Sequence, residues 1–562
     1  MVLMKNRKFL LLSIPALLLI CSLFAFRIVD FKTSKSLEIF FAFFRELNIF
    51  YVDDTDSEQL VKVGIDAMLE SLDPYNEFIP EENIETLEFQ TTGEYGGMGA
   101  IIRQGKDYPT IAEVYENSPA HKAGLMTGDI ILRVDTLSVK GLAVDHVSRL
   151  LKGVPKSNLS ITVKRYGSSD SLQYSFKREK IHVSSVPYFG MVSKNTGYIR
   201  VANFTADCSK EVESAFKNLK SKDKITGLIL DFRGNPGGLL QEAVKIVNLF
   251  VQKNELVVYT KGKIKEFDQE YKTTSRPADT EMPLIVLVDR ASASASEIVA
   301  GAFQDLDRAV IVGERTFGKG LVQATRSLPY NTQLKLTTAK YYIPSGRCIQ
   351  AVDYTLRDEN GNVGNIPDSL SSEFKTRNGR SVRDGGGIVP DIQYKQPMYS
   401  HAASILYGRN ILFDYATRYH HAHKQIEQPN LFSLTDREID DFYEYLKEIN
   451  FSYQSQAEYQ YKEFIKASQQ EELLPLFQRF ADSIQTVIDN NSLKAIYAKR
   501  SEIKKLLEEE IVGRYYFQKG RVQCAIVNDE IIQISLGVLG DPNQYSNILS
   551  ASSTEEKVGA EM

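Results

Sequence analysis

Histidine is scarce in this chain, and it is missing where its chemistry would matter most. Only 7 of the 562 residues are histidine, and none lies between His182 and His401. A serine activated by a histidine close to it in sequence is therefore excluded over that whole stretch. If the chain is a serine hydrolase, another base must take the serine proton there.

Cysteine and metal-binding spacings are also sparse. The four cysteines are widely scattered, and no Cys-x-x-Cys or His-x-x-x-His spacing occurs. A disulfide framework and a metal site are both disfavoured, and we expect no cofactor. A net charge of −5 gives no reason to expect a nucleic-acid partner.

The N-terminus has the pattern of an export signal. Three basic residues, Lys5, Arg7 and Lys8, precede an apolar run over residues 9–26. The run approaches the ~20 residues needed to cross a bilayer. We expect residues 1–30 to form a retained signal anchor rather than a cleaved signal peptide, and a lipoprotein attached through Cys21 fits less well. The remainder of the chain is predicted to lie outside the cytoplasm, in the cell envelope or periplasm, held to the membrane by this anchor.

Composition and periodicity divide the rest of the chain. With 43% hydrophobic and 25% charged residues over 562 positions, the chain has an ordinary globular composition and should contain several domains. Apolar residues recur every three or four positions in residues 31–90 and again in residues 397–562, which predicts helices. Residues 179–396 alternate strands with helices, which is typical of a layered α/β fold.

A glycine-rich loop opens the segment at residues 91–178. It contains Tyr95, Gly96, Gly97, Met98 and Gly99. Without a Gly-Lys-Ser/Thr ending it is a poor phosphate loop, but glycines allow backbone N–H groups to converge on an anion. Together with Ser118-Pro119-Ala120 and Gly128-Asp129-Ile130, it resembles a PDZ domain, a module that captures the terminal carboxylate of a peptide. A glycine-rich hairpin in a small barrel is the alternative interpretation.

One serine and one lysine are placed to do chemistry. Ser294 follows the buried strand predicted at residues 284–288 and begins a helix, whose free N–H groups favour a developing oxyanion. Lys319 lies between Gly318 and Gly320 beside apolar residues, a setting that lowers the pKa of a lysine and lets it act as a base. In an extended segment Gln323 points to the same side as Lys319 and could orient it. A second oxyanion donor could come from Gly237 or Gly238.

Structural alternatives remain at this stage. Ser294-x-x-Glu297 also matches a capping box, so Ser294 could only cap a helix. Ser292 and Ser296 are nearby candidates for the nucleophile. Lys319 alone could be a surface lysine in a glycine turn.

Several motifs taken together resemble the carboxyl-terminal processing peptidases, also called tail-specific proteases. The resemblance covers about residues 35–395 and includes the PDZ pattern. Its motifs read Ser-Ala-Ser-Ala-Ser-Glu-Ile, Gly-Lys-Gly-x-Val-Gln, Asp-x-Arg-Gly-Asn-Pro-Gly-Gly and Leu-Asp-Pro-Tyr. The family uses a Ser/Lys dyad supported by a glutamine, which implies Ser294, Lys319 and Gln323. Lys319 follows Ser294 by 25 positions (319 − 294), the family spacing, and this selects Ser294 over its neighbours.

The resemblance implies a fold and an activity. The expected fold is a multidomain α/β protein with a crotonase-like or Clp-protease-like core (residues 179–396), an inserted PDZ domain (residues 91–178) and helical segments at either end. The expected activity is that of a serine endopeptidase acting near the free C-termini of protein substrates. A non-catalytic PDZ adaptor on a peptidase-like scaffold is the rival, but the retained Ser294, Lys319 and Gln323 argue against it. A Ser-x-x-Lys hydrolase fails on spacing.

The helices of residues 397–562 carry apolar stripes, of which Leu476, Phe480 and Ile484 are part. Such stripes must be covered. Packing on the core of the same chain is one possibility. A homodimer formed through this segment is the other, and it is the one we expect.

Overall fold

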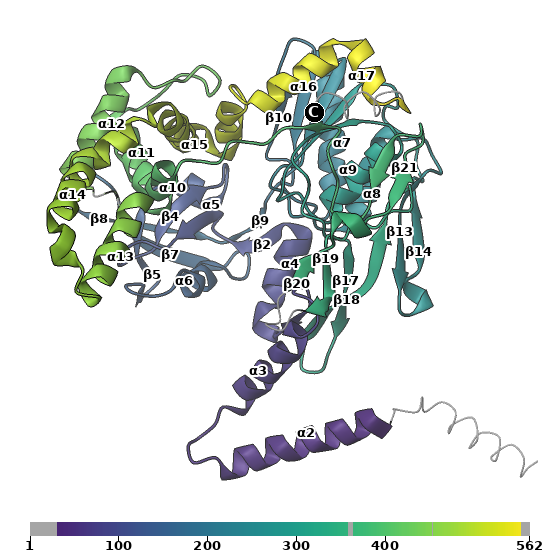
Figure 1. Ribbon diagram of the computed structural model, residues 1–562, viewed down its shortest axis with the longest axis horizontal. Helices are drawn as coiled ribbons and strands as arrows, with labels where there is room; N and C mark the ends of the chain where they lie inside the picture. Colours follow the sequence, from purple (N-terminus) through teal and green to yellow (C-terminus); the bar gives the residue numbers. More distant parts are fainter. Residues whose placement is uncertain (1–30, 358–362, 452, 454, 552–562) are drawn as a thin grey trace, which may run out of the picture. The chain divides into compact units, whose positions relative to one another are not determined.

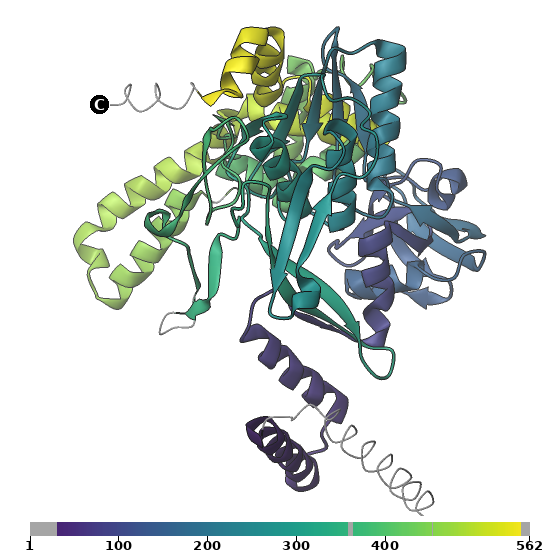
Figure 2. The same cartoon turned by 90° about the vertical axis from the view of Figure 1, so that its right-hand side faces the viewer.

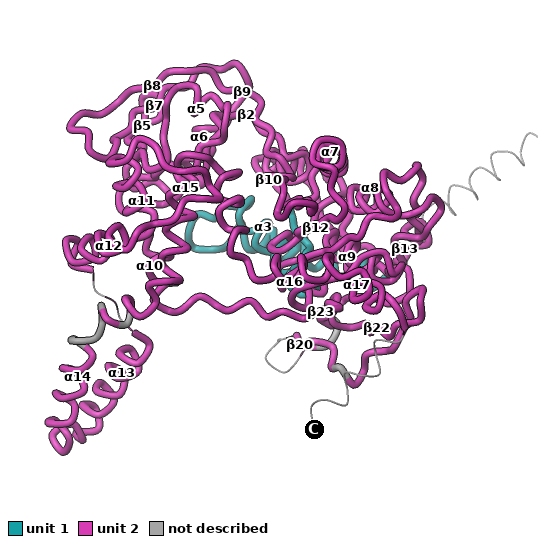
Figure 3. Tube along the Cα trace, turned by 90° about the horizontal axis from the view of Figure 1, so that it is seen from above, with its two compact units in different colours: residues 1–78 teal, residues 79–562 magenta. Residues whose placement is uncertain are grey.

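The computed structural model describes residues 31–357, 363–451, 453 and 455–551. The predicted anchor at residues 1–30 therefore lies outside the described residues. The chain divides into two compact units, residues 1–78 and 79–562 (Figure 3). The first contains helices α2 (Phe31–Phe50) and α3 (Ser57–Glu70), and neither helix has a buried residue. Strand β1 (Glu77–Ile79) spans the boundary.

The second unit begins with α4 (Ile84–Thr92) and a small antiparallel sheet in the order β3-β4-β5-β7-β8. Its elements are β3 (Ala100–Arg103), β4 (Thr110–Val114), α5 (Pro119–Ala123), β5 (Ile130–Val134), β6 (Leu137–Ser138), α6 (Val144–Leu151), β7 (Asn158–Lys164) and β8 (Ser171–Lys177). Alternate residues of β7, namely Leu159, Ile161 and Val163, are buried in its core. Strands β2 (Glu94–Gly97) and β9 (Glu179–His182) pair where the chain enters and leaves this domain, so it is an insertion.

A six-stranded sheet follows in the order β10-β11-β12-β15-β16-β23. Its strands are β10 (Tyr188–Met191), β11 (Thr196–Arg200), β12 (Gly227–Asp231), β15 (Leu284–Val288), β16 (Val310–Gly313) and β23 (Ile392–Gln393). All neighbours are parallel except β10 and β11. Because β12 and β15 run parallel side by side, the loops after them meet at one edge of the sheet.

Helices cover both faces of this sheet. One face packs on α7 (Cys208–Asn218), α8 (Leu240–Phe250) and α9 (Ala295–Asp305), where Val286 and Val288 of β15 are buried. The alternate residues Ile285 and Leu287 face the other side, and there they pack with residues of α16 (Glu530–Gly540) and the turn before it. Helix α16, in the yellow part of the chain in Figure 2, therefore helps to complete the core around this sheet.

In a second sheet β18 pairs with both β13 and β17, and β13 also pairs with β14. Its strands are β13 (Leu256–Gly262), β14 (Gln269–Lys272), β17 (Leu321–Ser327) and β18 (Gln333–Tyr342). Two ribbons follow, formed by β19 (Val352–Arg357) with β20 (Val363–Asn365) and by β21 (Glu373–Lys375) with β22 (Ser381–Arg383).

Most of the remaining helices form a separate core (Figure 1), to which α10 (His401–Gly408), α11 (Ile411–Ala422), α12 (Asp436–Glu448), α14 (Leu474–Tyr497) and α15 (Arg500–Ala525) contribute. Helix α13 (Gln456–Gln470) packs against α14, whereas α17 (Pro542–Ile548) packs with α16 on the six-stranded sheet. Across the described residues no single helix has the length and apolarity of a membrane span, although α15 and α16, bent by 58°, pass such a test as a pair.

Candidate active site

Ser294 occupies a strained turn between β15 and α9. It is the N-cap residue of α9, with φ 56° and ψ −114°. Non-glycine residues adopt positive φ at an energetic cost, and such strain is concentrated at functional sites. The side chain remains partly exposed. Its hydroxyl faces the N3 amide in capping-box geometry but makes no regular side-chain cap hydrogen bond.

The two neighbouring serines have structural roles. Ser292 is fully buried, and its hydroxyl donates to the Phe232 carbonyl at 2.8 Å. Ser296 is also fully buried, and its hydroxyl donates to the Asn235 carbonyl at 3.0 Å. Both hydroxyls are therefore engaged in buried hydrogen bonds, whereas Ser294 is partly exposed. The geometry separates three serines that the sequence motif leaves equivalent.

The Glu297 carboxylate joins the serine segment to the lysine segment. It accepts hydrogen bonds from the backbone N–H groups of Ser294 (2.8 Å), Gly318 (2.7 Å) and Lys319 (2.9 Å). A fourth bond comes from the Thr316 hydroxyl at 2.6 Å. Burial raises the pKa of Glu297 to about 7, and these four donors act in the opposite sense. Glu297 is thus more than a cap, because it fixes Ser294 and Lys319 to one carboxylate.

Tyr341 of β18 makes a second link between the two segments. Its hydroxyl lies 3.3 Å from the Ser294 carbonyl oxygen and also hydrogen-bonds the Lys319 carbonyl oxygen. The ring is buried in the core. No sequence signal marks Tyr341, since it is one of two adjacent tyrosines at the end of a strand of mixed polarity.

The glycines beside Lys319 allow another segment to approach closely. A Cβ on Gly318, whose φ is +85°, would lie 2.3 Å from the Ala351 Cβ, and one on Gly320 would lie 2.7 Å from the Gln350 nitrogen. The Gly320 N–H donates to the Gln350 side chain at 2.7 Å. Lys319 is therefore held in a closely packed turn just before β17.

Gln323 has its own partner in β18. Its side-chain amide donates to the Thr337 hydroxyl at 3.2 Å. The register of β17 against β18 shifts between Val322 and Gln323, so the simple alternation used to align Gln323 with Lys319 is interrupted here. Orientation of Lys319 by Gln323 stays a prediction.

The loop of residues 234–238 runs against Ser294. A Cβ on Gly237 would lie 2.8 Å from the Ser294 Cβ and 2.9 Å from the nitrogen of Ala295, a buried residue. The Gly237 N–H is engaged, since it donates to Asn235 Oδ1 at 2.8 Å. Within the described part of the chain, the N–H groups of Gly238 and Ala295 have no hydrogen-bond acceptor.

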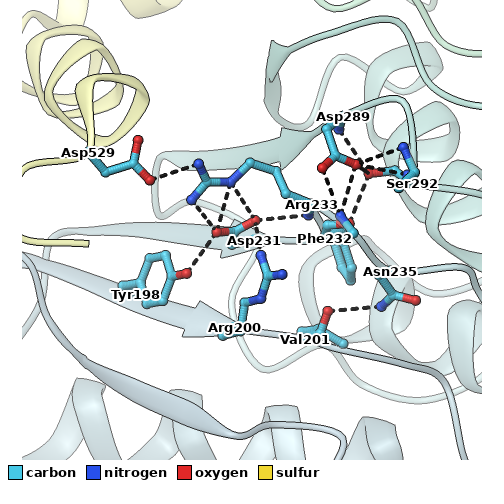
Figure 4. Close-up of polar contacts among 12 residues, drawn as sticks. Tyr198, Arg200, Val201, Asp231, Phe232, Arg233, Asn235, Asp289, Ser292 and Asp529 are labelled. Carbon is cyan, nitrogen blue, oxygen red and sulfur yellow. Dashed lines mark hydrogen bonds and ion pairs between the residues drawn. The ribbon is translucent and has the colours of Figure 1, made fainter. Parts of the chain in front are cut away.

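A buried ionic cluster holds the start of this loop (Figure 4). Asp231 is fully buried and contacts Arg200 (2.8 Å), Arg233 (2.6 Å) and the Tyr198 hydroxyl (2.7 Å). Burial alone would raise the pKa of Asp231, but Arg200 and Arg233 hold it well below its usual range. Arg233 also contacts Asp529 of the C-terminal region. Sequence reasoning gave no role to these charged residues.

The predicted carboxylate loop is only partly a loop. Tyr95, Gly96 and Gly97 belong to β2, whereas Met98 and Gly99 form the turn into β3. A Cβ on Gly99 would lie 2.3 Å from the Ser118 Cβ. Burial raises the pKa of Tyr95 to about 12, and hydrogen bonds from the backbone N–H groups of Gly99 and Ala100 lower it. The phenol group is therefore near the N–H group of Gly99, one of the amides predicted to receive a carboxylate.

Three sequence profiles match this chain. "Peptidase family S41" matches residues 195–357, "PDZ domain" matches residues 110–165, and "Probable PDZ-protease, C-terminal helical domain" matches residues 402–539. The predicted combination of a peptidase core with a PDZ domain and a helical C-terminal domain is confirmed.

Named proteins agree with these profiles. A carboxy-terminal-processing protease of Bartonella bacilliformis is 35% identical over 327 residues, 58% of this chain and 75% of that protein. A probable CtpA-like serine protease of Staphylococcus aureus is 37% identical over 309 residues, 54% of this chain and 61% of that protein. Among solved structures, a photosystem II D1 C-terminal processing protease is 27% identical, with a TM-score of 0.33, over 62% of this chain and 90% of that one. Because the Bartonella bacilliformis relative is 35% identical and is matched over 75% of its length, the chain belongs to the carboxy-terminal-processing protease family.

Proposed function

We propose that this chain is a serine endopeptidase that cleaves protein substrates near their C-termini, with Ser294 as nucleophile and Lys319 as general base. The observation that carries the proposal is the Glu297 carboxylate, which accepts hydrogen bonds from the backbones of both residues. Engagement of the Ser292 and Ser296 hydroxyls in buried bonds supports the choice of Ser294.

The chemistry follows from these roles. Neutral Lys319 takes the proton of the Ser294 hydroxyl while its oxygen attacks the peptide carbonyl carbon. The resulting oxyanion accepts hydrogen bonds from backbone N–H groups, and we assign these to Gly238 and to Ala295, the first residue of α9. Protonated Lys319 then gives its proton to the leaving amine as the peptide bond breaks. Water, deprotonated by Lys319, attacks the acyl-enzyme and releases the acid.

Gly238 fits the donor role better than Gly237. The Gly237 N–H already donates to Asn235 Oδ1, whereas Gly238 is exposed. Gly237 serves a different need, because any side chain there would collide with Ser294.

The PDZ domain supplies substrate recognition in this proposal. Free C-termini with apolar last residues would add beside β3, with the terminal carboxylate at the backbone N–H groups around Gly99. Attachment of the protein to the cell envelope by residues 1–30 belongs to the same proposal.

Single substitutions test the assignment. Ser294→Ala and Lys319→Ala should each lower cleavage of a denatured protein substrate by several orders of magnitude and leave the fold intact. Ser292→Ala is the matched control, since it removes a buried structural hydroxyl and should retain turnover below its unfolding temperature. An active Ser294→Ala enzyme would reject the nucleophile, and wild-type protein without any peptidase activity would favour the non-catalytic adaptor.

A further inference from the structure

An ion pair joins the C-terminal helical region to Arg233, just before the 234–238 loop. Asp529 lies in the turn between α15 and α16, and its carboxylate is 2.7 Å from Arg233 Nη1 (Figure 4). Both side chains are largely buried, with 16% and 12% of their surface exposed. Arg233 directly precedes the loop that runs against Ser294.

Asp529 balances the charge of the cluster. Arg200 and Arg233 both contact one carboxylate, that of fully buried Asp231. Two guanidinium groups on a single buried carboxylate leave an excess positive charge, and an unbalanced buried charge is costly. Asp529 provides the second carboxylate. Without it, Arg233 would lose one of its two acidic partners.

The position of Arg233 is transmitted to the loop through the backbone. The Arg233 N–H donates to Asp231 Oδ1 at 2.9 Å, and the next N–H, of Gly234, donates to Asp289 at 2.8 Å. Three residues later Gly237 lies against the Ser294 Cβ. The start of the loop is thus fixed by carboxylates, and its end reaches the nucleophile.

We propose that Asp529 is a positioning residue for peptide-bond cleavage. It acts from the C-terminal helical region on Arg233, and through Arg233 it holds the 234–238 loop where Gly238 can stabilise the oxyanion. This inference rests on the proposed function of Ser294 and of the loop. It gives the C-terminal helical region a part in the reaction in addition to covering the sheet.

A purely structural role for Asp529 must be separated from this one. Asp529 is the N-cap of α16, and its other carboxylate oxygen accepts the Ile531 N–H at 3.2 Å. Two substitutions separate the role of Asp529 as an N-cap from its role as the partner of Arg233. Asp529→Ser keeps a good cap but loses the charge and the reach to Arg233, whereas Asp529→Glu keeps the charge and loses the preferred cap.

The experiment measures kcat, KM and Tm of the full chain with a peptide substrate that has a free apolar C-terminus. Asp529→Ser should lower kcat about tenfold, a fraction of the loss typical for an oxyanion donor, with KM nearly unchanged. Its Tm should also fall, because Arg233 loses a buried acidic partner. Asp529→Glu should keep most of the kcat although its Tm falls. Glu530→Gln is the control for charge, because the adjacent Glu530 contacts Tyr394 at 2.7 Å and not Arg233. It should keep the wild-type kcat.

Activity that follows the cap and not the charge would overturn the proposal. The proposal is wrong if Asp529→Ser keeps the wild-type kcat. It is also wrong if Asp529→Glu loses kcat together with Tm. Failure of the proposed function is recognised separately, since Ser294→Ala would then cleave as well as wild type whatever Asp529 does.

Discussion

Glu297 acts at the residue scale on both members of the proposed dyad. One buried carboxylate accepts four donors, among them the N–H groups of Ser294 and Lys319. Only an ionised carboxylate can accept from all four, because a protonated oxygen becomes a donor. The alignment of Ser294 with Lys319 therefore depends on the charge of Glu297.

Activity should consequently rise with pH. Burial raises the pKa of Glu297 to about 7. Below this pH the Glu297 carboxyl gains a proton, and one of its four donors loses its acceptor. Protonation of Lys319 should also lower activity at low pH, because Lys319 accepts the serine proton only when it is neutral. We expect kcat for a small peptide to fall steadily from about pH 9 to about pH 5 with chemistry rate-limiting. A flat profile over that range would contradict both assignments.

Glu297→Gln should damage catalysis more than stability alone explains. The amide of glutamine has one acceptor oxygen, and its NH₂ group would face N–H donors, so buried donors lose partners at about 1–3 kcal/mol each. We expect kcat to drop about 100-fold together with a lower Tm.

The matched control for that variant is Glu242→Gln. Glu242 is also buried in the core, where it accepts the Ser209 N–H at 2.8 Å, far in sequence from the dyad. It should lower Tm and keep kcat. Equal losses of kcat in both variants would mean that Glu297 acts through stability only.

At the scale of elements, the turn from β2 into β3 is where the PDZ domain is expected to bind a carboxylate. The phenol group of Tyr95, a residue of β2, is near the backbone N–H groups of Gly99 and Ala100, which lower its pKa. A substrate carboxylate needs those same N–H groups. If the proposed carboxylate capture is right, Tyr95 and the substrate compete for the same N–H donors.

Tyr95→Phe should tighten peptide binding. The substitution removes the phenol oxygen and keeps the ring, so the terminal carboxylate meets free amides. We expect Kd for a peptide with an apolar free C-terminus to fall about threefold to tenfold, measured by fluorescence anisotropy. The amidated peptide is the control and should show no gain, since it lacks the charge. A gain of equal size for both peptides would argue against carboxylate capture.

Local elements of this fold were predictable from sequence, and their long-range partners were not. The buried strand before Ser294 and the glycines around Lys319 are visible as short patterns. Tyr341 reaches the dyad because β18 packs beside it, and Ile531 and Ile532 cover the sheet from the far end of the chain. Such contacts depend on tertiary packing. The sequence predicts Glu297 only as part of a capping box, because the Ser294-x-x-Glu297 pattern does not show that its carboxylate also accepts hydrogen bonds from the Lys319 segment.

At the scale of the whole chain, the C-terminal region buries one apolar surface on the sheet and leaves another exposed. Helix α16 and the turn before it pack on the sheet, so one predicted alternative, packing on the core of the same chain, holds for this part. Helix α14 instead leaves Leu476 and Phe480 80% and 72% exposed. A homodimer through this segment stays a proposal, and α14 is its best-supported surface.

The double variant Leu476→Glu/Phe480→Glu should convert a dimer into a monomer at micromolar concentration. Four charges in a two-fold interface cannot be buried together. Light scattering on the full chain measures the change. Truncation near residue 397 is a poorer test, because it would also uncover Ile285 and Leu287 of the sheet. If wild type and variant are both monomeric, the dimer proposal is lost.

The most direct test of the central claim is to locate the acyl-enzyme. Wild-type protein is mixed with a cleavable peptide, quenched in acid during turnover, digested and mapped by mass spectrometry. Our account predicts the mass of the acyl fragment on the peptide that contains Ser294, and its absence in Lys319→Ala, where the serine proton has no base. An adduct on another residue, or turnover by the wild type with no covalent adduct at any quench time, would contradict a Ser294–Lys319 mechanism.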